Sequence, residues 1–254
     1  MSWQPVDCHA HSTHSDGALE IAQVVERARA LGVVPSIADH VTRDIAKGVR
    51  SVAEAERYVE ALERHPVLRS GEFCWHDALW RELPDAIVRR LSHRIGSLHA
   101  VFLPTGRVVH AFGRALPDAF RVDEYMETHV ANLERLAREM PVDILAHPTL
   151  LPLPFRGWPL EEVWAERFEE RAVHALRRAG IAFEISNRYR PHERFVRRAI
   201  DAGVRISLGS DGHSFAQVAD VVWPLELARR LGLRDDELYD PRVHGSRTGL
   251  HAAA

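Results

Sequence analysis

The chain alternates between amphipathic stretches with helical spacing and short apolar runs. Residues 19–31 place Leu19, Val24 and Ala28 on one helical stripe, with charged residues elsewhere. The apolar run 33–40 follows directly and ends at His40. A strand after each helix, repeated along a chain, is the pattern of a parallel sheet with helices outside it.

The same alternation continues toward the carboxyl terminus. Strands are predicted at residues 3–8, 33–40, 66–73, 94–99, 141–148, 181–187 and 204–213. Helices are predicted at residues 19–31, 52–65, 83–93, 122–140, 160–180 and 192–203. About seven strands in a chain of 254 residues favour a closed (β/α) barrel. An open doubly wound sheet is the alternative, but it would not bring all strand ends to one point.

Two segments do not follow the alternation. Residues 100–121 lack clear periodicity and contain Gly, Pro and Arg, so a long loop is expected, either a lid or a connector. Residues 233–254 are polar and contain Gly and Pro, and we expect a loosely held tail there. No break in composition marks a second domain, so residues 1–232 are predicted to form one barrel.

Composition narrows the class of protein. The chain has 33 Lys and Arg against 36 Asp and Glu, a net charge of −3, so no overall positive field attracts nucleic acid or an anionic membrane. It has two cysteines, no signal-peptide pattern at its start and no apolar run of membrane-spanning length. We therefore expect a soluble cytoplasmic protein without a disulfide framework.

The predicted strands end in groups that bind metals. Sixteen histidines are scattered along the chain, and several stand together with Asp or Glu where an apolar strand stops. These residues are His9, His11, Asp16, His40, Glu72, His99, His147, Asp211 and His213. In a parallel barrel the carboxyl ends of the strands meet at one rim, so the nine side chains are predicted to converge.

Nitrogen and oxygen ligands of this kind suit Zn, Mn or Fe, and the absence of cysteine from the set argues against a closed structural zinc site. Nine ligands exceed the needs of one ion, so two or three divalent ions are expected, with Glu72 as a bridging carboxylate. Cys8 and Cys74 lie beside candidate ligands in the sequence, and we assign them no chemistry.

Six short motifs in order resemble those of the polymerase and histidinol phosphatase (PHP) superfamily of metal-dependent phosphoesterases. They are "DCHAHSTHSDG", "IADH", "SGEF", "GSLH", "LAHP" and "LGSDGH", and they extend from His9 to His213. The departures from the family pattern, Ala38 for Thr and Gly212 for Ala, lie outside the ligand set. The resemblance implies a distorted (β/α)7 TIM-like barrel that binds up to three ions.

The resemblance also implies how the ligands are divided. One ion would take His9, His11, Glu72 and Asp211, and a second would take Glu72, His99 and His147. A third would take Asp16, His40 and His213. The 27 residues from Glu72 to His99 are too few for the inserted domain of some family members, which favours the compact form.

The predicted reaction is hydrolysis of a small phosphomonoester, of the histidinol-phosphatase type, by a metal-activated hydroxide. Asp211, His213 and His14 are the candidates for the acid that protonates the leaving oxygen. Candidate phosphate ligands are the arginines in predicted rim loops, namely Arg43, Arg156, Arg188 and Arg190. Ordinary solvated arginines are an equally good interpretation of each.

Two other functions remain open. A PHP-type nuclease or 3'-5' exonuclease would act on nucleic acid through a basic groove lined with aromatic side chains. Trp75, Trp80, Trp158 and Trp223 are the tryptophans that could supply stacking surfaces. A non-catalytic metal-binding module is the other alternative, and the complete ligand set argues against it. The sequence does not indicate an oligomeric state.

Overall fold

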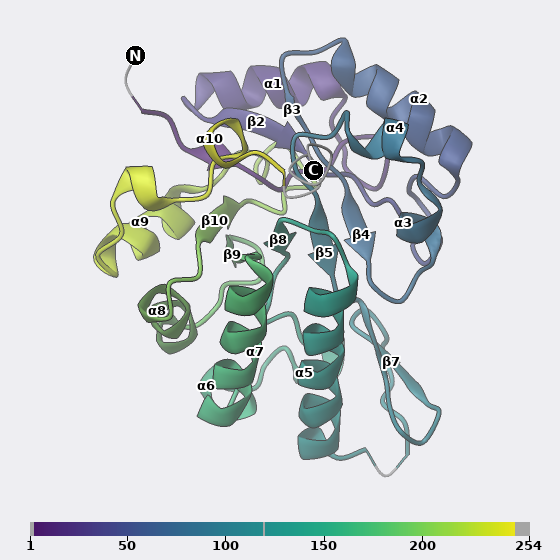
Figure 1. Ribbon diagram of the computed structural model, residues 1–254, viewed down its shortest axis with the longest axis vertical. Coiled ribbons are helices and arrows are strands. Elements are labelled where there is room, and N and C mark those ends of the chain that lie inside the picture. Colours follow the sequence, from purple (N-terminus) through teal and green to yellow (C-terminus); the bar gives the residue numbers. More distant parts are fainter. Residues whose placement is uncertain (1–2, 119, 247–254) are drawn as a thin grey trace.

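The computed structural model describes residues 3–118 and 120–246, and these form a mixed α/β single domain (Figure 1). The strands are β1 (Val6–Asp7), β2 (Val34–Ile37), β3 (Leu68–Arg69), β4 (Glu72–Cys74), β5 (Ile95–Ser97), β6 (Ala100–Phe102), β7 (Val108–His110), β8 (Ile144–Leu145), β9 (Ala182–Ser186) and β10 (Ile206–Gly209). The helices are α1 (Ile21–Ala30), α2 (Val52–Glu63), α3 (Leu79–Glu82), α4 (Asp85–Val88), α5 (Val122–Glu139), α6 (Leu160–Val163), α7 (Glu166–Ala179), α8 (Glu193–Asp201), α9 (Val222–Arg230) and α10 (Pro241–His244).

Parallel pairing dominates the centre of the molecule. One sheet has the order β1-β2-β3 and a second has the order β10-β9-β8-β5-β4, and all pairs in both are parallel. An antiparallel hairpin, β6-β7, stands apart from them. Parallel strands place their carboxyl ends on the same side, so the loops that follow them share one rim.

The two parallel sheets are joined at both of their margins. An isolated parallel bridge pairs Ala10 with Gly212, and the His11 amide donates to the Gly212 carbonyl at 3.0 Å. A second bridge pairs His40 with Glu72. The segments after β1 and β10 therefore lie side by side, as do the end of the β2 segment and the start of β4.

The strand predicted at 66–73 is divided in two. β3 pairs with β2, whereas β4 pairs with β5, so the chain changes partner at Ser70 and Gly71. Gly71 packs closely there, because a Cβ at this position would lie 2.8 Å from Cγ2 of Val41. The division puts Glu72 at the start of β4 rather than at the end of a longer strand.

Four of the predicted helices are confirmed, as α1, α2, α5 and α8. The helix predicted at 160–180 is interrupted between α6 and α7, where fully buried Trp164 has a ψ of 70°, outside the helical region. Of the helix predicted at 83–93, only the single turn of α4 forms. Helix α9 was not predicted from the sequence.

The two irregular segments are more ordered than their composition indicates. The stretch expected to be a long loop, 100–121, contains the hairpin β6-β7. In the expected tail, Tyr239 is buried and its amide donates to the Ile206 carbonyl at 2.8 Å, while α10 follows at Pro241–His244. Residues 247–254 of that segment lie outside the described residues.

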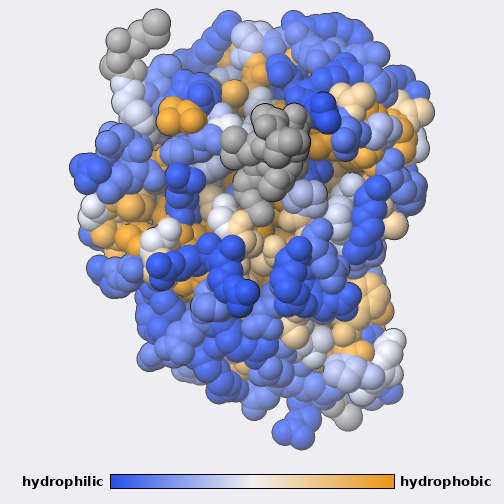
Figure 2. Space-filling model, in the orientation of Figure 1, coloured by the Kyte–Doolittle hydropathy of each residue, from blue (hydrophilic) through white to orange (hydrophobic). Residues whose placement is uncertain are grey.

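Amphipathic helices cover the strands. Helices α5 and α7 lie next to each other in front of the β8 and β9 region (Figure 1). Their apolar faces are buried, with Leu133 and Leu176 fully inaccessible, and the outer surface over them is largely hydrophilic (Figure 2). Within residues 3–118 and 120–246, no helix is long and apolar enough to cross a membrane.

Candidate metal centre

Glu72 lies at the middle of a cluster of five histidines. Its carboxylate is 1% exposed, and every histidine approaches it through a ring nitrogen. Oε1 lies 3.2 Å from Nε2 of His99 and 3.0 Å from Nε2 of His147. Oε2 lies 3.5 Å from Nε2 of His9, 3.7 Å from Nε2 of His11 and 2.7 Å from Nδ1 of His40. The two oxygens thus face two different sets of imidazoles, as the predicted bridging role requires.

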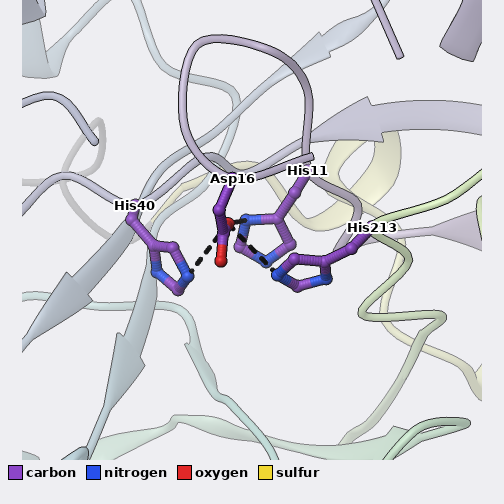
Figure 3. Close-up of side chains that lie close together, drawn as sticks. All are labelled: His11, Asp16, His40 and His213. Carbon is purple, nitrogen blue, oxygen red and sulfur yellow. Dashed lines mark ion pairs between the residues drawn. The ribbon is translucent and has the colours of Figure 1, made fainter. Parts of the chain in front are cut away.

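A second carboxylate, Asp16, gathers three histidines at the edge of the cluster (Figure 3). Oδ1 of Asp16 lies 3.8 Å from Nδ1 of His11, 3.5 Å from Nε2 of His40 and 3.2 Å from Nε2 of His213. Asp211 stands on the opposite side of His11, with Oδ1 3.4 Å from Nε2. His11 and His40 each use one ring nitrogen toward Glu72 and the other toward Asp16.

All nine predicted ligands therefore converge. Eight of them form three groups in which the ligand atoms lie within 4.8 Å of one another, and the ninth, His147, reaches the cluster through Glu72. The groups are His9, His11 and Asp211; His40, Glu72 and His99; and His11, Asp16, His40 and His213. His11 and His40 belong to more than one of these groups, a sharing that the sequence motifs did not indicate.

Cations fit this arrangement chemically. Oε2 of Glu72 and Nδ1 of His40 are buried 2.7 Å apart, yet neither atom has a hydrogen-bond partner in good geometry. Nε2 of His9 lies 3.1 Å from Nε2 of His11, and one proton at most can lie between these two nitrogen atoms. Lone pairs and carboxylate oxygens that face one another without donors are satisfied by a bound cation, and N and O ligands of this type suit Zn, Mn or Fe.

Backbone strain accompanies two of the ligands. His147 has φ of 29° and Asp211 has φ of 49°, in the left-handed region that non-glycine residues rarely adopt. Such conformations cost on the order of 1–3 kcal/mol each and persist where surrounding structure holds them. For Asp211 the support includes its amide, which donates to the His9 carbonyl at 2.7 Å.

Burial and neighbouring charges shift the ligand pKa values in opposite directions. Burial raises the pKa of Glu72, but the surrounding histidines, His40 first, outweigh it and hold that pKa well below the usual range. Burial and the charge of His40 lower the pKa of His11 to about 3. Burial lowers the pKa of His9, but the Glu184 carboxylate reverses the effect and raises it well above 6.5. The centre therefore combines an ionised carboxylate with neutral His11.

Three buried acidic residues outside the predicted set support the ligands. Asp39 accepts hydrogen bonds from Ser12 and Ser15 and so fixes the loop that carries Asp16. Asp7 accepts from the Ser210 amide at 2.8 Å, next to Asp211. Glu184 contacts both His9 and the backbone of His147. Glu184 could have been found from the sequence, because it is the single charged residue in the apolar run 181–187.

Cys74, to which we assigned no chemistry, contacts one of the ligands of the centre. Its Sγ lies 3.0 Å from Nδ1 of His99, the nitrogen that faces away from Glu72. Cys74 is fully buried on β4. Cys8, by contrast, belongs to the apolar core together with Val6 and Ile95.

An open cavity of about 290 Å³ lies over the cluster. Seven of the nine predicted metal ligands line it, all except His9 and His11, whereas Ile45, Phe112 and Tyr189 form apolar walls. Arg188 also lines it, with Nη1 3.6 Å from Oδ1 of Asp211. The cavity thus presents an arginine and apolar surface beside a group of metal ligands.

The other three candidate arginines lie elsewhere. Arg156 is behind the wall, stacked between Phe112 and Tyr189 and donating to the carbonyls of Leu151 and Ala111. Arg43 forms two hydrogen bonds to the Glu82 carboxylate. Arg190 donates to the carbonyl and side chain of Asn187 and lies over Trp223. Arg188 is therefore the candidate arginine that lines the cavity.

The three candidate acids also differ in whether they line the cavity. Asp211 and His213 line the cavity, but His14 does not, since its ring lies 5.5 Å from that of Tyr58. The tryptophans do not build an aromatic groove at the site. Trp75 and Trp80 are buried, Trp158 is 48% exposed, and the cavity lining includes none of the four.

The fold is similar to that of solved bacterial structures. A histidinol phosphate phosphatase from Lactococcus lactis subsp. lactis, complexed with zinc, L-histidinol and phosphate, matches with a TM-score of 0.69 and 15% identity over 97% of this chain and 98% of that chain. A protein from Listeria monocytogenes assigned as a histidinol phosphatase matches with a TM-score of 0.67 and 10% identity, over 85% of this chain and 97% of that chain. No protein-family model and no curated protein sequence matches the chain.

Proposed function

We propose that the protein is a metal-dependent phosphoric monoester hydrolase of the PHP superfamily. The observation that carries the proposal is the convergence of N and O ligands, eight in three close groups and His147 against Glu72, beside a cavity lined by Arg188. The fold shared with histidinol phosphatase structures supports it. A binding module without catalysis would not need a cavity open to a second molecule above its ions.

We also propose that the strands form the distorted seven-stranded barrel of that superfamily, in residues 1–232. Its support is the bridge between Ala10 and Gly212 at one margin and the bridge between His40 and Glu72 at the other. Together they link the two parallel sheets into a ring of strands, if β3 and β4 count as one broken strand. The ligands then belong to its carboxyl-terminal rim, except Glu72, which begins β4.

Two or three divalent ions are proposed, with zinc as the first choice because the ligand set is rich in imidazole. Glu72 would bridge, since Oε2 faces His9 and His11 while Oε1 faces His99 and His147. When bound, such ions activate water as a nucleophile and neutralise charge on the phosphoryl group. Glu72 and Asp211 are ionised at neutral pH because the pKa of each is held below its usual range, by His40 and by His11 respectively, against the effect of burial.

Arg188 is proposed to bind the phosphoryl oxygens. It lines the cavity and its guanidinium lies beside Asp211 and His213. A guanidinium presents several donors in one plane and matches phosphate geometry. Arg156 would act on the cavity only through the aromatic rings of Phe112 and Tyr189, between which it is stacked.

The proton for the leaving oxygen is proposed to come from His213 when two ions are bound. Burial lowers the pKa of His213, but the hydrogen bond to Asp16 outweighs it and raises that pKa. Arg188 donates to Nδ1, so the transferable proton is on Nε2, which faces Asp16. Asp211 is a poorer donor because it is ionised at neutral pH. If three ions bind, His213 is a ligand with Asp16 and His40, so the metal content per chain decides its role.

The proposed substrate is a small phosphomonoester such as histidinol phosphate. The cavity of about 290 Å³ has room for a phosphate and a small organic group, and Ile45, Phe112 and Tyr189 offer that group an apolar surface. The phosphatase from Lactococcus lactis was complexed with zinc, L-histidinol and phosphate, which supports the same class of substrate here.

Metal removal and reconstitution test the proposal. The protein is dialysed against a chelator until its metal content is verified as negligible, and hydrolysis of an aryl phosphate is then measured before and after addition of Zn or Mn. We expect hydrolysis to be lost on chelation and to return when Zn or Mn is added. Glu72→Gln, purified in the same way, is the control for contaminating phosphatases. Full activity of the metal-free protein would contradict the proposal.

A substrate panel tests the class of substrate. Metal-replete protein is offered histidinol phosphate, nucleoside monophosphates and a labelled oligonucleotide side by side. We expect the highest kcat/KM for histidinol phosphate. Preference for the oligonucleotide would assign the protein to the nucleases instead.

A further inference from the structure

A second buried carboxylate, Glu184, lies behind the metal ligands. It belongs to β9 and is fully inaccessible to solvent. Oε1 lies 2.8 Å from Nδ1 of His9, and Oε2 accepts a hydrogen bond from the backbone amide of His147 at 2.6 Å. One side chain therefore contacts ligands from two separate strand ends, those after β1 and β8.

The contact with His9 fixes which ring nitrogen carries the proton. A carboxylate only accepts hydrogen bonds, so Nδ1 of His9 must be the protonated nitrogen of the neutral ring. When the ring loses its other proton to become a metal ligand, the lone pair is on Nε2, which faces His11 and Oε2 of Glu72 at 3.1 and 3.5 Å. Glu184 thus directs the metal-binding atom of His9 into the cluster, as a carboxylate behind a ligating histidine does.

The contact with His147 acts on the backbone instead. His147 has φ of 29°, a strained conformation for a residue with a side chain. Its amide donates to a charged acceptor, and such hydrogen bonds are among the stronger ones. In this conformation Nε2 of His147 points at Oε1 of Glu72, 3.0 Å away.

Gly209 provides the space that Glu184 occupies. A Cβ at position 209 would lie 2.1 Å from Oε1 of Glu184 and 3.0 Å from Cβ of His9. The end of β10 must therefore lack a side chain for the carboxylate to reach His9. Glu184, His9 and Gly209 are adjacent although they are up to 200 residues apart in the sequence.

We propose that Glu184 is a positioning residue that prepares His9 and His147 together for two adjacent metal ions. The inference rests on the proposed metal centre and deepens it. Glutamine cannot replace Glu184, because it has one acceptor oxygen where two are needed. Its amide would either oppose the His147 N–H or donate to Nδ1 of His9, which would force the proton onto Nε2 and block metal binding.

The wild-type protein provides the first test. Nitrogen NMR of the zinc-loaded protein, with His9 assigned by comparison with His9→Gln, reports which ring nitrogen bears the proton. We expect a proton on Nδ1 and zinc on Nε2. A proton on Nε2, or zinc on Nδ1, overturns the inference without any variant of Glu184.

Zinc affinity provides the second test. In competition with a chelator, Glu184→Gln should show a zinc affinity about 10- to 100-fold lower at the sites that contain His9 and His147. The group of Asp16, His40 and His213 should keep its affinity. Glu169→Gln is the matched control: Glu169 is also fully buried but lies on α7 against Arg194 and Arg198, so its loss should leave zinc affinity unchanged.

Gly209→Ala keeps every ligand and Glu184 itself, but displaces the carboxylate. We expect the same loss of zinc affinity, and this variant decides the question if Glu184→Gln does not fold. If Glu184→Gln or Gly209→Ala binds zinc with wild-type affinity, the inference about Glu184 is overturned but the proposed metal centre is not. Absence of zinc binding by the wild-type protein overturns the proposed metal centre and the inference with it.

Discussion

At the scale of single residues, Glu72 shows how one side chain can define a centre. Its two oxygens face different histidines, and Oε2 has no hydrogen-bond partner of its own. A buried carboxylate is costly unless donors or a cation satisfy both of its oxygens, and only Oε1 has a hydrogen bond, with His147. The surrounding imidazoles and the proposed ions would satisfy the Glu72 oxygens.

Arg188 and Arg43 form a matched pair for testing phosphate binding. Arg188 lines the cavity, whereas Arg43 is held by Glu82. We expect Arg188→Ala to lower kcat/KM about 10- to 100-fold, because a charged hydrogen bond to substrate contributes about 1.5–3 kcal/mol. Arg43→Ala should leave kcat/KM unchanged. Equal kinetics of the two variants at equal zinc content would refute a phosphate role for Arg188.

Metal occupancy should depend on pH because zinc and protons compete for the same nitrogens. Burial lowers the pKa of His99, but Cys74 and Glu72 raise it, so that the pKa of His99, like that of His9, lies above 6.5 in the metal-free protein. Protons therefore compete with zinc for these rings already above pH 6.5, and zinc affinity falls further as the pH is lowered. Equilibrium dialysis should show loss of zinc below about pH 6. Full zinc retention at pH 4 would contradict a histidine-rich centre.

At the scale of elements, buried polar contacts join helices that the hydrophobic pattern alone does not orient. Glu169 on α7 is fully buried and binds Arg194 and Arg198 on α8, at 2.9 and 3.1 Å. These contacts fix how α7 and α8 cover β9, the strand that carries Glu184. The interruption between α6 and α7 is also a tertiary effect. The helix breaks at Trp164, where the ring is fully buried in the core.

Glu169→Gln should therefore destabilise the fold. Both arginines lose a charged acceptor, but they are about a quarter to a third exposed and regain water. We expect the free energy of unfolding to fall by about 1–3 kcal/mol. Urea denaturation of the chelator-treated protein measures it, with Glu166→Gln, which removes only a solvent-exposed partner of Arg198, as the control. An unchanged midpoint would show that the pair does not stabilise the helix contact.

At the scale of the whole molecule, the proposed ions connect distant parts of the chain. The ligands follow β1, β2, β5, β8 and β10 or begin β4, so each ion would tie together several strand ends. A ligand that binds only the folded chain stabilises it by mass action. The metal centre should thus contribute to the stability of the entire domain.

Thermal unfolding with and without zinc tests this coupling. At free zinc 100-fold above the dissociation constant, one site adds about 2.7 kcal/mol. For a chain of this length the midpoint Tm should rise by roughly 5–10 °C. Zinc added back after chelation should restore the higher Tm, whereas identical Tm values in chelator and in zinc would contradict a centre that joins the strands.

The sequence by itself determined the main alternation of strands and helices and which side chains are candidate ligands. Periodicity fixed α1, α2, α5 and α8 because their apolar stripes are long, and each ligand stood out because a strand end does not otherwise need His, Asp or Glu. Tertiary structure alone decided the rest. Which nitrogen of His9 faces the ions, which arginine reaches the cavity, and that Glu184 and Gly209 meet depend on contacts between strands far apart in the chain. Local patterns carry no information about such contacts.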